Sequence, residues 1–132
     1  MFGWILNRHK LLADAKLLGR WGEKRCERFL KRKGFHKLVS NFPSKAGEID
    51  LVMVAPDGTV VFVEVKTRTS ESFEPAESSI TTAKKAKLFR TAKYFLATHK
   101  IENRPCRFDI VTVVLGQTGP AQIMHYENAF VV

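Results

Sequence analysis

Two apolar stretches rich in β-branched residues, at positions 59–67 and 108–115, constrain the fold of this 132-residue chain more than any other feature. Continuous runs of this kind are typical of strands that are buried on both faces of a sheet. A helical pattern over residues 82–100 lies between them. A helix of that length can return the chain to the start of the first strand. We therefore expect the two strands to be parallel and joined by a right-handed crossover.

The remaining pattern places a helix before these elements and a hairpin next to the first buried strand. Leu18, Trp21, Cys26 and Leu30 recur at helical spacing, and Gly34 is suited to end that helix. Residues 1–12 are either a loose basic extension or an extra helical turn. The other expected elements are an edge strand at 35–40, a loop at 41–46, a strand at 48–54, a turn at 56–58, a loop at 68–79, a turn at 116–120 and a short strand at 122–126.

These elements predict a single α/β domain over residues 1–132. Its small mixed β-sheet would combine a three-stranded antiparallel meander with one parallel strand reached through the crossover helix, and helices would flank it. Cys26 and Cys106 form no CxxC pair, so we expect two buried thiols in a reducing compartment. No stretch is long and apolar enough for a signal peptide or a membrane span, which predicts a cytoplasmic protein without a membrane partner.

The net charge of +9, from 22 basic and 13 acidic residues, favours contact with a polyanion such as a nucleic acid. A merely solubilising surface is the alternative interpretation. The sequence contains no phosphate-binding P-loop, no GxSxG motif and no dinucleotide-binding fingerprint, so nucleotide hydrolysis and acyl transfer have no support.

Two acidic motifs lie on either side of the predicted turn: Gly-Glu-Ile-Asp at residues 47–50 and Val-Glu-Val-Lys at 63–66. Side chains alternate along a strand, so Glu64 and Lys66 share one face. Charged groups in an apolar strand cost desolvation energy unless they meet a partner or a metal. Asp50 joins that face only if it pairs with an even-numbered residue. A three- or five-residue connection satisfies this condition, and the three-residue loop pairs Asp50 with Glu64.

Such a cluster suits Mg²⁺ or Mn²⁺, which prefer carboxylate and water oxygens. We expect Asp50 and Glu64 to bind the metal and Lys66 to orient the attacking water or neutralise charge on the phosphate. Glu23, on the first helix, could supply another metal ligand and belongs to the candidate catalytic set. Glu48 has the same parity as Asp50 and stays a candidate. The simpler alternative is an ordinary ion pair on a solvated strand face.

The sequence resembles the uncharacterised bacterial family called UPF0102, or YraN-like. The matching residues are Gly19-Arg-Trp-Gly-Glu23, Gly34-Phe35, Asn41, Gly47-Glu-Ile-Asp-Leu51, Val61-Phe-Val-Glu-Val-Lys66 with Arg68, Lys84 or Lys85, Arg107-Phe-Asp109 and Asn128-Ala-Phe130. This resemblance implies a fold similar to restriction endonucleases of the PD-(D/E)XK superfamily and to archaeal Holliday junction resolvases. It also implies metal-binding and catalytic roles for Asp50, Glu64 and Lys66, with Glu23 matching the helix acid of the resolvases. Relatives often carry Arg and Gly in the loop where this chain has Ser44, Lys45 and Ala46.

Further basic and polar residues are candidate nucleic-acid contacts. Thr67 and Arg68 directly follow the acidic strand and could hold a phosphate. Lys45 in the loop and Lys84 and Lys85 on the second helix could contact the phosphate backbone, although a solvated helix face is an equal alternative.

The histidines and Asp109 carry weaker signals. His9, His36, His99 and His125 show no metal-ligand spacing, so we interpret them as surface or packing residues. Asp109 is expected to form a structural ion pair with Arg107 or a neighbour, with support of the acidic site as the alternative.

Two functions remain open. The first is a Mg²⁺- or Mn²⁺-dependent DNA endonuclease, structure-selective in its resolvase-like version, for which a homodimer is expected because two strands must be cut. The second is a non-catalytic nucleic-acid-binding or protein-interaction module that retains the nuclease fold.

Overall fold

A computed structural model describes residues 2–69 and 80–131 of the chain, so residues 70–79 of the loop predicted over 68–79 lie outside the described part. Residues 68 and 69 of that predicted loop are part of a strand instead. The helices and strands of the described residues follow one another along the chain as α1 (Phe2–Ala13), α2 (Ala15–Arg32), β1 (His36–Ser44), β2 (Gly47–Val54), β3 (Val60–Thr69), α3 (Thr82–Thr98), β4 (Cys106–Leu115) and β5 (Gln122–Phe130).

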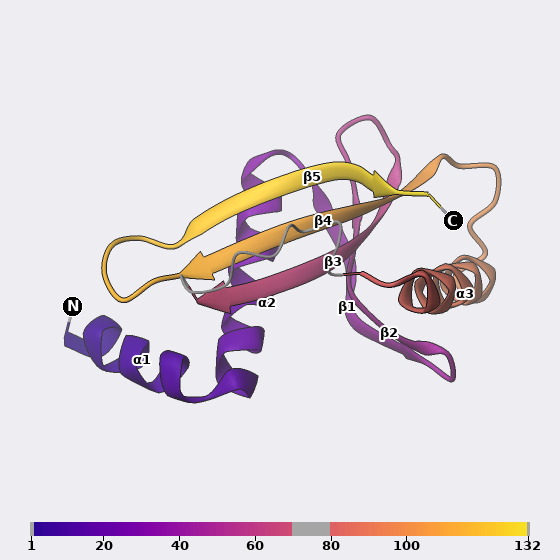
Figure 1. The fold of residues 1–132 in the computed structure, drawn as a ribbon. Helices are drawn as coiled ribbons and strands as arrows, with labels where there is room; N and C mark the ends of the chain where they lie inside the picture. Colours follow the sequence, from indigo (N-terminus) through magenta and orange to yellow (C-terminus); the bar gives the residue numbers. More distant parts are fainter. Residues whose placement is uncertain (1, 70–79, 132) are drawn as a thin grey trace.

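The strands form one mixed sheet in the order β1-β2-β3-β4-β5. β1, β2 and β3 are an antiparallel meander, β4 is parallel to β3, and β5 is antiparallel to β4. Figure 1 shows the β3 and β4 arrows pointing the same way, with β5 running back along β4. The predicted fold class is confirmed. The predicted parallel pairing of β3 and β4 is confirmed too, and α3, which connects these strands along the chain, is long enough to span the sheet.

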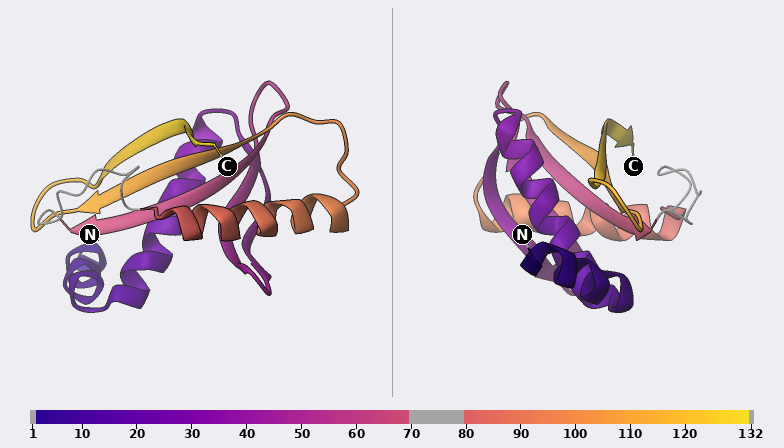
Figure 2. Two further views of the ribbon diagram at one scale, coloured as in Figure 1. Left: turned by 45° about the vertical axis from the view of Figure 1, so that its right-hand side comes forward. Right: turned by 90° about the vertical axis from the view of Figure 1, so that its left-hand side faces the viewer.

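Two apolar layers enclose the sheet. One contains Cys26 and Leu30 of α2 together with Val61 and Val63 of β3, and the other contains Leu88 and Phe95 of α3 together with Val60 and Phe62 of β3. Alternate residues of β3 thus face opposite helices, as the period of a strand requires. α2 passes behind the strands in Figure 1, and the two views in Figure 2 show α3 running along another side of them.

Several boundaries differ from the prediction. Residues 2–13 form the helix α1, so the helical alternative for this segment is the observed one. β1 continues through the expected loop to Ser44, and it tolerates Pro43 because an edge strand has one row of N–H groups with no strand to pair. β5 extends to Phe130, beyond the predicted end of the last strand.

Some predicted surface properties also differ. Cys26 is buried as expected, but Cys106, at the start of β4, is exposed, so the prediction of two buried thiols is wrong for that residue. Among the described helices, none is long and apolar enough to cross a membrane.

Candidate active site

The antiparallel ladder between β2 and β3 ends next to Asp50. Its register joins Val54 to Val60 and runs as far as Leu51 and Val63. Beyond that pair, the backbone N–H of Val65 donates to Oδ2 of Asp50 at 2.9 Å. A side-chain carboxylate thus accepts a strand N–H just beyond the last ladder pair, and the sheet opens at this point.

The predicted turn register is confirmed. Ala55 N donates to Thr59 O at 2.9 Å across a three-residue loop whose Gly58 has a φ of 91°. Continuing this register by one pair would place Asp50 opposite Glu64, but the ladder ends at Leu51 and Val63. The local turn chemistry therefore decides the register of the two strands up to the position next to the acids.

Glu64 and Lys66 lie on the α3 side of β3, since Phe62 before them packs into the α3-side core. The Glu64 side chain is only 8% exposed, and the ammonium of Lys66 lies 3.8 Å from its Oε1 atom. The predicted pairing of acid and lysine on one strand face is therefore observed, in a position largely removed from water.

Asp50 itself does not follow simple alternation. Ile49 and Val52 both pack into the α3-side core although they are three residues apart, while Leu51 packs into the α2-side core. On the neighbouring strand, Asn41 adopts a left-handed φ of 51°. β2 is therefore irregular at Asp50, which places the carboxylate at the seam between the two faces of the sheet.

The electrostatics of Asp50 reflect this position between two faces. Burial raises its pKa to about 7, with a further upward contribution from the charge of Glu64, while the hydrogen bond from Val65 opposes the shift. Glu23, on the α2 side, adds to the increase, and Lys84, on the α3 side, opposes it. A second carboxylate so near a buried one leaves a local need for positive charge.

Lys84 supplies part of that charge. Its ammonium donates to Oε1 of Glu64 at 2.8 Å. Burial lowers the pKa of Lys84, but the bond to Glu64 outweighs it, so the pKa is raised. Burial and repulsion from Lys84 lower the pKa of Lys66. The sequence suggested Lys84 only as a phosphate contact. Lys84 lies among the acids because of the way α3 packs on the sheet, and residue spacing in the sequence does not predict that packing.

Glu23 is close enough to influence Asp50 but has a different partner. Its Oε1 accepts from Nδ2 of Asn41 at 3.0 Å, and Asn41 also donates to Glu48 at 3.1 Å. These residues line a hollow of about 580 Å³ between α2 and the β1–β2 hairpin, together with Arg20. Among residues 2–69 and 80–131, no three His, Cys, Asp or Glu side chains are close enough to hold a metal together. The structure therefore does not gather Glu23, Asp50 and Glu64 into one three-carboxylate group.

Thr67 lies on the opposite face from Glu64, against α2. A Cβ atom added to Gly22 would be 1.8 Å from Oγ1 of Thr67, so this glycine permits close contact between helix and strand. Arg68 has the parity of Lys66, and its charge contributes to lowering the pKa of Lys66. The two predicted phosphate contacts are thus separated by the sheet, with Arg68 on the side of the acids.

The two other basic candidates lie apart from the acids. The Lys85 ammonium lies 5.6 Å from the ring centre of Phe130, towards β5. Lys45 is exposed at the tip of the β1–β2 hairpin. Of the four predicted basic contacts, Lys84 and Arg68 are therefore the two that lie beside the Glu64–Lys66 pair.

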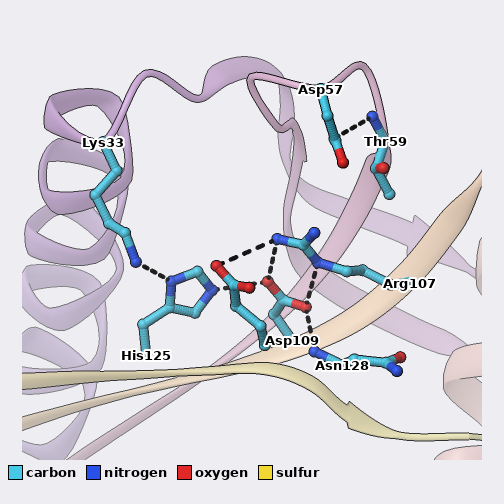
Figure 3. A network of polar contacts seen from close by, with 8 residues as sticks. Lys33, Asp57, Thr59, Arg107, Asp109, His125 and Asn128 are labelled. Atoms are coloured by element: carbon cyan, nitrogen blue, oxygen red, sulfur yellow. Dashed lines mark hydrogen bonds and ion pairs between the residues drawn. The ribbon is translucent and has the colours of Figure 1, made fainter.

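Asp109 belongs to a separate buried network, drawn in Figure 3. Its carboxylate accepts from Arg107 Nε at 3.0 Å and from the backbone of Asn128 at 2.9 Å, and its Oδ2 lies 2.7 Å from His125 Nε2. Burial raises the pKa of Asp109, but the hydrogen bonds from His125 and Arg107 outweigh it and the pKa is lowered. The predicted ion pair with Arg107 is confirmed. His125, 16 residues away in the chain, gave no sequence signal for this contact because β5 pairing brings it there.

Comparison with known proteins places the chain among relatives of similar length. A UPF0102 protein of Cupriavidus necator is 43% identical over 106 residues, which cover 80% of each chain. A UPF0102 protein of Pelotomaculum thermopropionicum is 41% identical over 121 residues, covering 90% of this chain and all of the relative. Residues 22–113, which contain Glu23, Asp50, Glu64, Lys66 and Lys84, match the profile of the uncharacterised protein family UPF0102. The chain is a member of the UPF0102 family.

Proposed function

We propose that this protein is a metal-dependent endonuclease that hydrolyses phosphodiester bonds in DNA. The observation that carries the proposal is that the largely buried carboxylates of Asp50 and Glu64 lie close enough for their charges to interact where the sheet opens, with Lys66 and Lys84 beside Glu64. Two carboxylates and two ammonium groups in a partly buried position are costly for the fold, and a site that binds and cleaves phosphodiesters has a use for both kinds of charge.

The donor set fits Mg²⁺ or Mn²⁺. Asp50 has a pKa of about 7 because it is buried near a second carboxylate, so a divalent cation would relieve an existing repulsion. Mg²⁺ is commonly held by one or two carboxylates and keeps several waters, so Asp50 and Glu64 suffice without a third protein carboxylate. Glu23 could contribute through a water molecule from the α2 side.

A bound divalent ion would supply Lewis-acid activation of water and stabilisation of the leaving oxygen. The residues of this chain would do the positioning. Asp50 and Glu64 would hold the cation at the sheet opening, and the positive charge of Lys66 would stabilise the charge that develops on the phosphate oxygens. Once Glu64 has a cation, the long side chain of Lys84 would be available to a phosphate of the substrate.

The finer form of the proposal rests on resemblance to the PD-(D/E)XK superfamily and the Holliday junction resolvases. The acid of β2 and the Glu-x-Lys of β3 stand in the order of the superfamily motif. We therefore propose branched DNA as the substrate and a homodimer as the cleaving species, since two strands are cut at a junction.

A second candidate function is a nucleic-acid-binding module without turnover. The bond from Lys84 to Glu64 favours it, because a lysine already satisfies the acid that a metal would otherwise need. The two functions differ in their response to metal: Mn²⁺ should raise the melting temperature of a nuclease, and Asp50→Ala should abolish that increase. A pure binding module should melt at the same temperature with and without Mn²⁺.

The test is cleavage of labelled linear, nicked, flapped and four-way DNA in the presence of Mn²⁺. The wild type should cut at least one of these substrates, and Lys66→Ala should lose at least a hundredfold in rate because its charge acts on the transition state. Lys16→Ala, an exposed position at the start of α2, is the matched control and should cut normally. Equal cleavage by wild type and Lys66→Ala, or no metal-dependent change in melting or cleavage, would remove the proposal.

A further inference from the structure

A hollow lies between the tip of the β1–β2 hairpin and the outer half of α3. It has a volume of about 510 Å³ and is lined by Pro43, Ser44, Lys45, Ala46, Arg90 and Tyr94. Tyr94 is one of the most exposed large side chains of the described residues, with 53% of its surface open to solvent. An open aromatic ring therefore lies beside the cationic side chains of Lys45 and Arg90 in one hollow.

The walls of this hollow are held by specific contacts. Ser44 Oγ lies 2.8 Å from Oγ1 of the buried Thr91, which joins the hairpin tip to α3. The same serine accepts from the backbone N–H groups of Ala46 and Gly47 and so shapes the turn. The ring of Tyr94 contacts Phe42 with 5.8 Å between ring centres. The hollow is therefore preformed, which reduces the entropic cost of binding.

A smaller hollow lies next to this one, on the side of Lys84. It is lined by Ala46, Gly47, Glu48, Lys84, Lys87, Leu88 and Thr91, and it shares Ala46 with the larger one. At its other end, Lys84 reaches Glu64. Residues three and four apart lie on one helix face, so Lys84, Lys87, Thr91 and Tyr94 form a continuous row along α3. From Lys84 to Tyr94 this row spans about 15 Å.

The charges beside the outer hollow and along α3 indicate which kind of ligand would bind there. Lys45 and Arg90 border the outer hollow, and no acidic side chain lines it among the described residues. The smaller hollow is lined by Lys84 and Lys87 and by one acid, Glu48. Ammonium and guanidinium groups along a track bind phosphates, and an open aromatic ring stacks on a base. Together they match a nucleic-acid strand better than a peptide or an apolar ligand.

We propose that this hollow is a subsite for one unpaired nucleotide of the substrate, whose base stacks on Tyr94 while Arg90 and Lys45 hold the flanking phosphates. This proposal rests on the proposed nuclease function, which defines where the subsite lies along the strand relative to the acids. Along α3 the subsite lies about 15 Å from Lys84, the residue that bonds Glu64. A base in a continuous stack cannot reach the ring, so the subsite selects substrates with an unpaired segment there.

The test is binding without catalysis, measured by fluorescence anisotropy in EDTA. Tyr94→Ser should weaken binding of a short labelled single strand by about 5- to 100-fold, the usual loss when one stacked base loses its aromatic partner. Its affinity for a blunt duplex of the same sequence should change less than twofold. Tyr94→Phe should bind like the wild type because it keeps the ring.

Phe89→Ser is the matched control. Phe89 is also an exposed aromatic residue of α3 with a cation on its ring, the Lys93 ammonium at 5.5 Å, but it does not line the hollow. It should leave both affinities unchanged. In the wild type, an abasic site at one position of the single strand should cost as much as Tyr94→Ser, and in Tyr94→Ser the same abasic site should cost nothing more.

Equal losses in Tyr94→Ser and Phe89→Ser, an unchanged affinity in Tyr94→Ser, or a wild type that prefers an acidic peptide to the single strand would each overturn the subsite. The failure of the nuclease proposal is separate. If the protein cuts no DNA, but Lys66→Ala still binds the single strand and this binding still depends on Tyr94, the subsite proposal holds and only the nuclease proposal fails.

Discussion

Asp50 is the residue at which the fold and the proposed chemistry have opposing requirements. Its carboxylate is largely buried and lies near Glu64, so in the absence of a cation its ionised form is disfavoured even though the hydrogen bond from Val65 supports that form. Sites that need a strained or charged arrangement commonly lower the stability of the fold. Asp50 should therefore reduce stability in a pH-dependent way.

We expect Asp50→Asn to stabilise the metal-free protein, and more at pH 8 than at pH 5. The carboxyl titrates near 3.8 when unfolded and near 7 when folded, so the folded state binds the additional proton between these values. Stability therefore falls as pH rises through this window. Asn keeps the acceptor for Val65 without the charge. At about 1.4 kcal/mol per pKa unit, the gain at pH 8 should reach a few kcal/mol.

Urea denaturation in EDTA at both pH values measures this difference. A gain at pH 8 no larger than that at pH 5, or a loss of stability at both, would contradict the assignment of a raised pKa to Asp50.

Among the elements, α2 and β3 depend on one close approach. Gly22 faces Thr67 on β3 so closely that any Cβ atom would overlap the threonine side chain, and a β-branched residue cannot turn away easily. α2 carries Glu23 next to this glycine, so the same contact positions that acid near the seam that holds Asp50.

Gly22→Ala should lower the free energy of unfolding by about 1–3 kcal/mol, the usual cost of overpacking a buried contact. Gly19→Ala is the matched control on the same helix. A Cβ atom at Gly19 would meet nothing within 4 Å, and alanine is the better helix former, so this variant should gain about 0.5–1 kcal/mol. Chemical denaturation distinguishes the two, and equal effects at both positions would show that contact with β3 does not limit residue 22.

At the scale of the whole molecule, the net charge of +9 becomes informative through its distribution. Lys45, Lys87 and Arg90 gather along the row that begins at Lys84, whereas the acids Asp50 and Glu64 are largely withdrawn from the surface. A polyanion would meet a positively charged approach to a negatively charged centre. Charge of this kind acts on affinity through release of counterions.

Affinity for a DNA duplex should therefore fall by roughly 100-fold between 50 and 200 mM salt, as expected for about four phosphate contacts. Lys87→Gln should reduce the slope of log affinity against log salt by about one, because it removes one contact. Lys16→Gln, at the start of α2, removes the same charge away from the row. A slope that responds equally to both substitutions would indicate that only net charge matters. Anisotropy titrations at several salt concentrations provide the measurement.

Local chemistry in the sequence was sufficient for much of the fold and for part of the site. Gly58 and the turn around it determined a three-residue loop, and that loop determined the register in which Leu51 pairs with Val63, one position before Asp50 and Glu64. The two-residue period of a strand placed Lys66 beside Glu64. The length of α3 was sufficient to predict the parallel pairing of β3 and β4. All of these depend on residues near one another in the chain, where backbone geometry leaves few alternatives.

Tertiary packing decided the rest. Lys84 bonds Glu64 because α3 lies against the acid-bearing face, and Tyr94 lines the same hollow as Lys45 because Thr91 holds the hairpin tip. Glu23 turns to Asn41, and Asp50 accepts from Val65, because the sheet opens at an irregular position. Contacts between distant segments depend on where the helices pack on the sheet. Local residue types and spacing do not reveal that packing. The sequence alone determined the acids and lysine on which a site could be built, and only the folded chain decided which cations and which surface surround them.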